Sequence, residues 1–201
     1  MEVKSKSKKP DIRYLYDMKD VIYDKKWFKT APNLELYYMY RGVKKKGGLR
    51  YDITAIPARM LGQEFVRTKG NRNCKNFPEL YTILKGEAIF LMQKTKSRKI
   101  NIIEDIVAIK AKPGDWIVVP PKYAVVMINP LKKILKTANW VSEKNKNVYQ
   151  ELKVMKGAGY FYAKKGWIKN KNYKRVPKLR FKKPLKSMPK NLNFLNPVEK
   201  I

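Results

Sequence analysis

The sequence predicts an all-β domain, either a barrel or a double-sheet jelly roll. Short runs rich in β-branched and aromatic residues recur along residues 31–143. Gly and Pro turn signals separate these runs at intervals of about 8 to 12 residues, which is typical of both architectures. Hydrophobic residues make up 44% of the 201 residues. A chain of this length and composition is expected to bury a substantial core and to form one globular domain with terminal extensions.

The expected strands follow one another from residue 34 to residue 141. They are predicted at 34–40, 51–56, 64–68, 80–84, 87–92, 106–111, 116–119, 125–128 and 136–141. A basic hairpin loop at 43–48 is expected to join the first two strands, and Lys85-Gly86 supplies a turn before 87–92. Residues 69–78 are expected to be irregular. This alternation of strands and turns leaves little room for long helices.

The two ends of the chain differ from the middle in composition. Residues 1–30 form a basic N-terminal arm and lead-in segment, of which the first nine residues are too polar to pack and 12–28 carry enough apolar residues to lie against the domain. Residues 31–168 hold the barrel. Residues 169–201 form an extended basic tail, with prolines at 177, 184, 189 and 197 that disfavour regular structure. The sequence thus predicts three parts, of which only the middle one is a domain.

The charge balance is far from that of an ordinary soluble domain. The chain has 47 Lys and Arg against 16 Asp and Glu, a net charge of +31. Solubility alone asks for much less. A polyanion is the simplest expected partner, because dense phosphate charge turns the self-repulsion of such a protein into binding energy.

Several absences narrow the class of protein. The chain has no histidine, which removes the commonest metal ligand and general base from the chemistry available. Its single cysteine, Cys74, allows no internal disulfide and fits a reducing compartment. No apolar run approaches the roughly 20 residues of a membrane span, and no apolar segment follows the basic start as in a secretory signal. We therefore expect a cytoplasmic protein without membrane contact.

One motif connects the predicted barrel to a known superfamily. In GDWIVVPPKYAVVMIN, residues 114–129, Gly114 is followed at fixed spacing by Pro120, Lys122, Val125 and Asn129. This spacing is similar to the second conserved motif of the cupin superfamily, in which a glycine would stand at Lys122 and a metal-binding histidine at Val125. A valine side chain has no lone pair and cannot bind a metal.

A second motif and several longer segments sharpen this resemblance. Gly70-Asn-Arg-Asn73, followed by Glu79 and Gly86, looks like the first cupin motif with asparagine at both histidine positions. Beyond the superfamily, the chain resembles the archaeal cupin-type phosphoglucose (glucose-6-phosphate) isomerases. The segments that carry the resemblance are 51–57, 64–71, 78–93, 107–121, 128–130, 138–142 and 156–170. The resemblance implies a cupin double-stranded β-helix, that is, a jelly-roll barrel.

The resemblance also implies what the chain has lost. The family interconverts glucose 6-phosphate and fructose 6-phosphate at a metal held by three histidines and a glutamate. Carried over by position, these ligands fall on Asn71, Asn73, Glu79 and Val125. One carboxylate and two neutral amides are a poor ligand set for a divalent ion. We therefore expect no metal, no cofactor, no small-molecule substrate and no catalysis, so that the chain is a degenerate member of its family, a pseudoenzyme.

Part of the family's sugar-phosphate pocket is expected to persist. Thr54, Thr68, Gly70 and Tyr81 match positions that line it and, together with the four former ligand positions, define a vestigial pocket. One interpretation is that these residues remain because they pack or turn the backbone. The other is that an anion-sized pocket remains and holds a phosphate or sugar phosphate without turning it over.

The basic residues of the arm, loops and tail are the candidate RNA contacts. Trp167, Tyr173, Phe181 and Phe194 are available for base stacking or for hydrophobic anchorage. The candidate RNA-binding set is Lys4, Lys6, Lys8, Lys9, Lys44, Lys45, Lys46, Arg72, Lys164, Lys165, Trp167, Lys169, Lys171, Tyr173, Lys174, Arg175, Lys178, Arg180, Lys182, Lys183, Lys186 and Lys190. The tail is expected to become ordered by neutralising phosphates.

Three functions remain open on the sequence alone. The first is a non-catalytic, RNA-binding structural component of a ribonucleoprotein particle, most simply an archaeal ribosomal protein that contacts ribosomal RNA and neighbouring ribosomal proteins. The second is a sugar-phosphate isomerase or sugar-phosphate-binding cupin with a rebuilt site. The third is a DNA- or chromatin-binding protein, because a net charge of +31 does not distinguish DNA from RNA.

Overall fold

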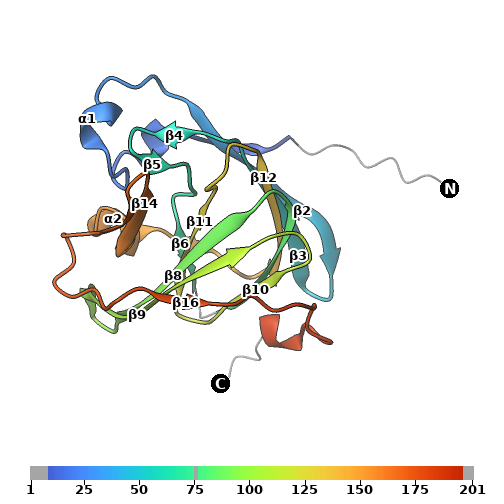
Figure 1. The fold of residues 1–201 in the computed structure, drawn as a ribbon. Helices are drawn as coiled ribbons and strands as arrows, with labels where there is room; N and C mark the ends of the chain where they lie inside the picture. The colour runs from blue at the N-terminus through green and yellow to red at the C-terminus, as the bar shows by residue number, and fades with distance from the viewer. Residues whose placement is uncertain (1–8, 75–76, 197–201) are drawn as a thin grey trace.

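The chain folds into an all-β barrel, as the sequence predicts. A computed structural model of the protein describes residues 9–74 and 77–196 (Figure 1). Two six-stranded sheets face each other and enclose a common core, and a small third sheet lies beside them. Within the described part of the chain, no helix has the length and apolar character needed to cross a membrane.

The first sheet is antiparallel throughout. Its strands, in spatial order, are β1 (Asp11–Tyr14), β2 (Glu35–Lys46), β3 (Leu49–Ile56), β12 (Leu135–Ser142), β7 (Glu79–Lys85) and β10 (Trp116–Val119). Strand β12 comes late in the chain but pairs with both β3 and β7. This crossover between early and late strands is the connectivity of a jelly roll rather than of a simple meander.

The second sheet is antiparallel except at one edge. Its strands are β13 (Asn147–Val148), β6 (Asn71–Asn73), β11 (Ala124–Ile128), β8 (Ala88–Lys96), β9 (Lys99–Ala111) and β16 (Arg180–Lys182). Strand β16 belongs to the tail and runs parallel to β9. The small third sheet contains β15 (Gly166–Lys169), β14 (Tyr160–Ala163), β5 (Glu64–Phe65) and β4 (Met60–Leu61).

The helical elements are short and lie outside the barrel. They are η1 (Tyr16–Met18), α1 (Lys25–Phe28), α2 (Gln150–Val154) and η3 (Asn193–Leu195). The predicted strands are all present in part, although β9 begins at Lys99 rather than at residue 106 and the short strands β1, β4, β13, β14, β15 and β16 were not predicted. The predicted strand 64–68 shrinks to the two-residue β5, and the segment expected to be irregular contains β6. The basic loop 43–48 is mostly strand, and its turn is confined to Gly47 and Gly48, whose φ angles of 56° and 73° suit glycine.

The central strands of the second sheet, β8 and β11, are buried on both faces, which explains why they are apolar without alternation. On β8, Phe90 and Met92 point into the barrel core, whereas Ile89 and Leu91 point outward into a second apolar cluster. This second cluster is covered by α2 and by the start of the tail. A strand covered on both faces carries a continuous apolar run, as β8 does.

Both terminal extensions pack on the barrel. In the lead-in segment, Leu15, Met18 and Val21 are fully buried in the main core, so this part lies against the domain as predicted. In the tail, the backbone of Leu185 exchanges two hydrogen bonds of 2.9 Å with that of Trp116 on β10. With β16 on β9, the tail therefore covers an edge strand of each large sheet, and covered edges resist pairing with other chains.

The expectation that the tail depends on RNA for its order is wrong for residues 169–196. Val176, Leu179 and Leu195 are buried against the barrel. Tyr173, a candidate RNA contact expected to serve either base stacking or hydrophobic anchorage, is only 6% exposed, and its hydroxyl bonds with Gln93 and the carbonyl of Gly157. Apolar side chains spaced between the lysines anchor the tail, so Tyr173 serves packing and not nucleic-acid contact.

A buried ion pair fixes the lead-in segment to the small sheet. Glu64 on β5 accepts a hydrogen bond from Arg67 Nε at 3.1 Å and one from the backbone N–H of Tyr23 at 2.7 Å. Arg67 also donates to the carbonyl of Val21, and both charged side chains are almost completely buried. The two charges therefore pair with each other and with backbone groups of the lead-in segment, while Lys25 also acts on Glu64 and the Arg67 guanidinium lies over the ring of Phe161.

We expect Glu64→Ala to destabilise the protein by about 3 to 5 kcal/mol, because it leaves the Arg67 guanidinium buried without a counter-charge. Urea unfolding followed by circular dichroism measures this loss. Glu104→Ala is the matched control, since Glu104 pairs with Lys94 at the surface and its loss should cost less than about 1 kcal/mol. Equal costs for the two variants would contradict the anchoring role of Glu64.

Candidate functional site

The barrel encloses a small cavity at the position of the predicted vestigial pocket. Its volume is about 50 Å³, enough for a few water molecules and well below the roughly 300 Å³ at which small-molecule sites begin. The cavity is lined by Tyr37, Met39, Arg41, Arg50, Asp52, Thr54, Thr68, Gly70, Asn71, Glu79, Tyr81, Val125, Met127, Asn139, Val141, Asn147 and Tyr149. Alternate residues of β2 and β3 contribute, because successive side chains of a strand point to opposite faces.

The most deeply buried charged group of the cavity is the carboxyl of Glu79. It is 3% exposed and its Oε2 accepts a hydrogen bond from Asn139 Nδ2 at 2.9 Å. The Tyr81 hydroxyl and the Asn73 amide also bond to it. Burial raises the pKa of Glu79 above its usual value, and these hydrogen bonds and Arg50 oppose that rise only in part.

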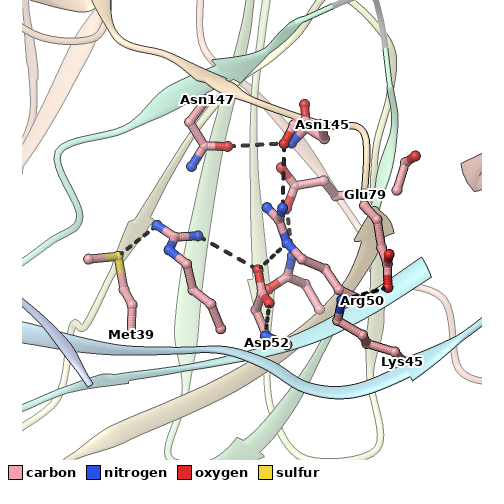
Figure 2. A network of polar contacts seen from close by, with 12 residues as sticks. Met39, Lys45, Arg50, Asp52, Glu79, Asn145 and Asn147 are labelled. Atoms are coloured by element: carbon pink, nitrogen blue, oxygen red, sulfur yellow. Dashed lines mark hydrogen bonds and ion pairs between the residues drawn. The ribbon is translucent and has the colours of Figure 1, made fainter. Parts of the chain in front are cut away.

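Asparagine side chains extend this network along the wall of the cavity, which Asn71 and Asn147 line. Asn73 donates from Nδ2 to the carbonyl of Phe77 at 2.8 Å, and its Oδ1 accepts from Asn145 at 2.9 Å and from Asn71 at 3.4 Å. Asn145 reaches Asn147 in turn, as Figure 2 shows. The oxygen of Asn73 is thus already engaged by two amide donors. A neutral amide chain occupies the region where the family resemblance places imidazoles.

A second buried carboxylate, Asp52 on β3, lies beside the cavity and is neutralised by arginine. Arg50 Nε donates to it at 2.9 Å, the backbone N–H of Gly42 donates at 2.7 Å, and Arg41 Nη1 lies 3.7 Å away (Figure 2). Sequence reasoning missed this cluster and also Asn139. The two-residue spacing of Arg50 and Asp52, which puts both on one face of β3, is the signal that could have found the pair, whereas Asn139 comes opposite Asp52 only through the pairing of β12 with β3.

The retained pocket residues divide into two groups. Thr68 and Gly70 have structural explanations: Thr68 bonds to the backbone of Met127 through both its N–H and its hydroxyl, and a Cβ at Gly70 would lie 2.6 Å from Val126. Thr54 and Tyr81 line the cavity, and Tyr81 bonds to the Glu79 carboxyl. The interpretation that these residues pack and turn the backbone therefore accounts for at least half of them.

The residues at the family's metal-ligand positions meet in space but do not fit a metal. Val125 on β11 is directly paired with Asn71 on β6, and Glu79 lines the same cavity. Val125 offers no donor, and the side-chain oxygen of Asn73 is committed to other amides. Across residues 9–74 and 77–196, no three His, Cys, Asp or Glu side chains gather as a metal site would need.

The candidate RNA contacts are spread over several surfaces. Lys4, Lys6 and Lys8 lie outside the described residues. Lys44 to Lys46 end β2 and are exposed, although Lys45 lies 3.3 Å from Glu143. Lys164 and Lys165 are exposed at the turn between β14 and β15. The exposed members of the tail are Lys169, Lys171, Lys174, Arg175, Lys178, Arg180, Lys182, Lys183, Lys186 and Lys190, and Lys9 is exposed near the start of β1.

Some candidates are engaged within the protein. Arg72 bonds to Glu151 at 3.2 Å, Lys186 bonds to Asp115 at 2.7 Å, and Arg180 makes two hydrogen bonds to Asp105. Trp167 is half-buried among Tyr160, Tyr162 and Phe181, so it presents little free ring surface. Arg180 and Lys186 hold the tail in place, Arg72 joins β6 to α2, and Trp167 packs the small sheet against the tail residue Phe181.

Comparison with known proteins places this jelly-roll barrel in one family. Residues 13–178 match the Glucose-6-phosphate isomerase (GPI) family, which is most of the chain, and the protein therefore belongs to it. Among its relatives is the glucose-6-phosphate isomerase of Thermococcus litoralis, 32% identical over 127 residues. That alignment covers 60% of this chain and 63% of the relative, so the chain spans less than two thirds of the relative's length.

Solved structures with a related fold share little sequence. The oxalate decarboxylase of Lactobacillus farciminis is 13% identical with a TM-score of 0.42, covering 53% of this chain and 29% of that one. A vicilin from Solanum melongena is 12% identical with a TM-score of 0.41, covering 60% and 32% of the two chains. At these values the likeness adds nothing to the family assignment.

The raised pKa of Glu79 predicts how its replacement changes stability with pH. The protonated carboxyl stabilises the fold fully below the ordinary pKa of 4.5, and this stabilisation is lost as pH rises through the raised pKa. Glutamine does not titrate, so the free energy of unfolding of Glu79→Gln does not follow this loss. The difference between its free energy of unfolding and that of the wild type should therefore grow by about 1.4 kcal/mol per pH unit above pH 4.5 and level off above the raised pKa of Glu79. Urea unfolding from pH 4 to 8 measures this, and a flat difference would contradict the assignment.

The poor ligand set predicts that metal binding returns only with imidazoles. We expect purified wild-type protein to bind no divalent ion at micromolar concentration, whereas Asn71→His/Asn73→His/Val125→His binds about one equivalent, because three imidazoles join Glu79. Equilibrium dialysis with Zn²⁺, Mn²⁺ and Fe²⁺, read by mass spectrometry, compares the two proteins. Tight stoichiometric binding by the wild type would show that other residues rebuilt the site.

Proposed function

We propose that this chain is a non-catalytic member of the glucose-6-phosphate isomerase family that binds RNA as a structural component of a ribonucleoprotein particle. The observation that carries the proposal is the donor set of the barrel cavity. Its former ligand positions hold Asn71, Asn73 and Val125, and the chain has no histidine elsewhere to replace them. The family's metal-dependent reaction then has no place to occur, and another property must account for the protein.

That property is positive charge without internal partners. Most of the 16 acidic residues are already committed to ion pairs. Exposed basic side chains such as Lys174, Arg175 and Lys178 make no ion pair or hydrogen bond within the described chain. Backbone phosphates would neutralise them, releasing counterions and favouring binding with little sequence preference.

The tail favours a structured RNA surface as the partner. It is held against the barrel by buried apolar residues, so its lysines are presented on a firm support rather than on a free chain. A domain with basic extensions of this kind is the usual design of a ribosomal protein, and we propose the archaeal ribosome as the particle, with neighbouring ribosomal proteins as further partners. This last step is an analogy of design.

A second function is favoured by the family itself. Membership of the glucose-6-phosphate isomerase family and the relative from Thermococcus litoralis support a sugar-phosphate enzyme or binding protein more directly than they support RNA binding. Against this stands a cavity of only about 50 Å³, which must open before a sugar phosphate enters. An isomerase assay with added Zn²⁺, Mn²⁺ or Fe²⁺, repeated with a chelator, tests this function; activity that the chelator abolishes would establish it.

Purified protein should bind single-stranded RNA with a steep salt dependence. Six or more phosphate contacts predict that log Kobs falls with log salt with a slope of about −4 or steeper. Fluorescence anisotropy of a labelled 20-nucleotide RNA between 50 and 300 mM salt measures the slope, and duplex DNA of equal length tests the DNA-binding alternative. Stronger binding to the duplex DNA would favour that alternative.

A charge-reversal pair separates a defined surface from mere net charge. Lys174→Glu/Arg175→Glu/Lys178→Glu alters exposed tail residues, whereas the control, Lys85→Glu/Lys96→Glu/Lys112→Glu, changes net charge equally at exposed lysines of other elements. We expect the tail variant to weaken RNA binding at least tenfold more than the control. An equal loss of RNA affinity in both variants would contradict the role of the tail as an RNA-binding surface.

A further inference from the structure

A groove outside the barrel has no part in the pocket described above. It lies where the lead-in segment, the end of α2 and the small sheet meet, and Figure 1 shows α1, α2 and β14 gathered on this side of the barrel. Its volume is about 420 Å³. The groove is lined by Ile22, Tyr23, Lys25, Lys156, Phe161, Ile168, Lys169, Asn170, Lys171 and Asn172. It shares no residue with the barrel cavity.

The lining is strongly and consistently positive. Four lysines contribute to it and no carboxylate does. The side chains of Lys156, Lys169 and Lys171 make no ion pair or hydrogen bond within the described chain, and Lys25 donates only to the carbonyls of Lys19 and Asp20. Four positively charged lysines that line one space repel one another, so an anion bound in it would lower their mutual repulsion.

The acidic groups that act on Lys25 are engaged elsewhere, and Asp24, next to Lys25 in the chain, accepts hydrogen bonds from the backbone N–H groups of Trp27 and Gln63. Glu64 is buried in its pair with Arg67, and Asp20 lies 3.9 Å from Lys153. Burial lowers the pKa of Lys25, and Lys156 lowers it further, whereas Asp20 and Glu64 offset these effects only in part. The groove therefore remains electropositive after its internal partners are taken into account.

The backbone that carries these lysines is held firmly. Asn170 Nδ2 donates to the carbonyls of Met155 and Ala158, each at 2.9 Å, and its Oδ1 accepts from the side chain of Asn172 at 2.8 Å. Lys156 adopts a φ of 55°, a left-handed conformation that glycine or asparagine normally takes after a helix. A fixed arrangement loses little entropy when an anion binds.

The groove also has an apolar wall of a kind that bases contact. Tyr23 is 37% exposed, and its ring packs on that of Phe161 with centroids 5.1 Å apart. Ile168 completes the apolar side. A free inorganic anion uses only the lysines, whereas a nucleotide uses both the lysines and the ring. The volume lies in the range of sites that hold a molecule of nucleotide size.

We infer that this groove binds the phosphate backbone of a single-stranded RNA segment, with Lys25, Lys156, Lys169 and Lys171 contacting phosphates and a base lying against Tyr23. This inference rests on the proposed function and assigns it a specific site. Two regions far apart in the sequence, residues 22–25 and 156–172, build the groove, so it exists only in the folded protein.

The test compares two triple variants that remove equal charge. The groove variant is Lys156→Asn/Lys169→Gln/Lys171→Gln, in which asparagine suits the left-handed backbone at position 156. The control is Lys85→Gln/Lys112→Gln/Lys122→Asn, because Lys122 is an exposed lysine that also has a positive φ, 70°. Circular dichroism and thermal unfolding establish that both variants fold. A labelled 12-nucleotide single-stranded RNA of mixed sequence is the probe.

We expect the groove variant to lose three phosphate contacts. The negative slope of log Kobs against log salt should therefore become shallower by about 2, and RNA binding should weaken by about 100-fold at 0.1 M salt. The control should change affinity less than about tenfold. If the wild type binds RNA and the two variants are weakened equally, the groove is not the site, although the proposed function stands. If the wild type binds no RNA, the proposed function and this site both fail.

A titration with inorganic phosphate tests whether the groove binds a free anion instead of RNA. Phosphate is titrated against the wild type and followed by the amide NMR signals of Gly157 and Asn170. Phosphate that saturates these signals at micromolar concentration, while RNA leaves them unchanged, would overturn RNA as the occupant. RNA that shifts them in the wild type but not in the groove variant would support the assignment.

Discussion

Burial of the Glu79 carboxyl constrains the whole interior of the barrel. A carboxyl without water must be neutral, paired with a positive charge or surrounded by donors. Here the groups that bond to it are neutral, with the charged Arg50 and Asp52 acting from farther away: Asn139, Tyr81 and Asn73 bond to it, and Asn73 is in turn held by Asn145. The interior is therefore stabilised by amide hydrogen bonds in the region where the family uses imidazoles and a metal. The same network fills space and leaves only a small cavity.

Negative and positive charges are segregated in this protein. Carboxylates such as Glu64 and Asp52 are buried and paired with arginine, and Asp105 and Asp115 fasten the tail through Arg180 and Lys186. Acidic residues thus serve the fold, and the remaining lysines are left on the surface without counter-charge. Such a surface costs self-repulsion in isolation and is stabilised when phosphates supply the missing charge. A fold that uses its acids internally in this way is suited to a permanent polyanionic partner.

The sequence predicted most of the fold because strands leave a local signal. Apolar runs bounded by Gly and Pro located β3, β7, β10, β11 and β12 within one or two residues. The packing of the tail was harder to predict. Lysines surround Tyr173 in the sequence, and the hydrogen bond that marks its buried position comes from Gln93, which is 80 residues away in the chain. The expectation that the family's ligand positions hold Asn71 and Val125 came from the sequence, but the amide network around them did not. The lysine-lined groove could not be predicted from the sequence either, because Lys25 meets Lys156, Lys169 and Lys171 only through tertiary contacts.

The central claim is that this isomerase-family fold serves a ribonucleoprotein particle. Sedimentation of a native cell extract on a density gradient, at low and moderately high salt and with or without RNase, tests it most directly when the protein is followed by mass spectrometry. The account predicts that the protein travels with one ribosomal subunit at fixed stoichiometry, resists the salt wash and is released by RNase. A protein that stays at the top of the gradient under every condition would contradict the account and return attention to the barrel cavity.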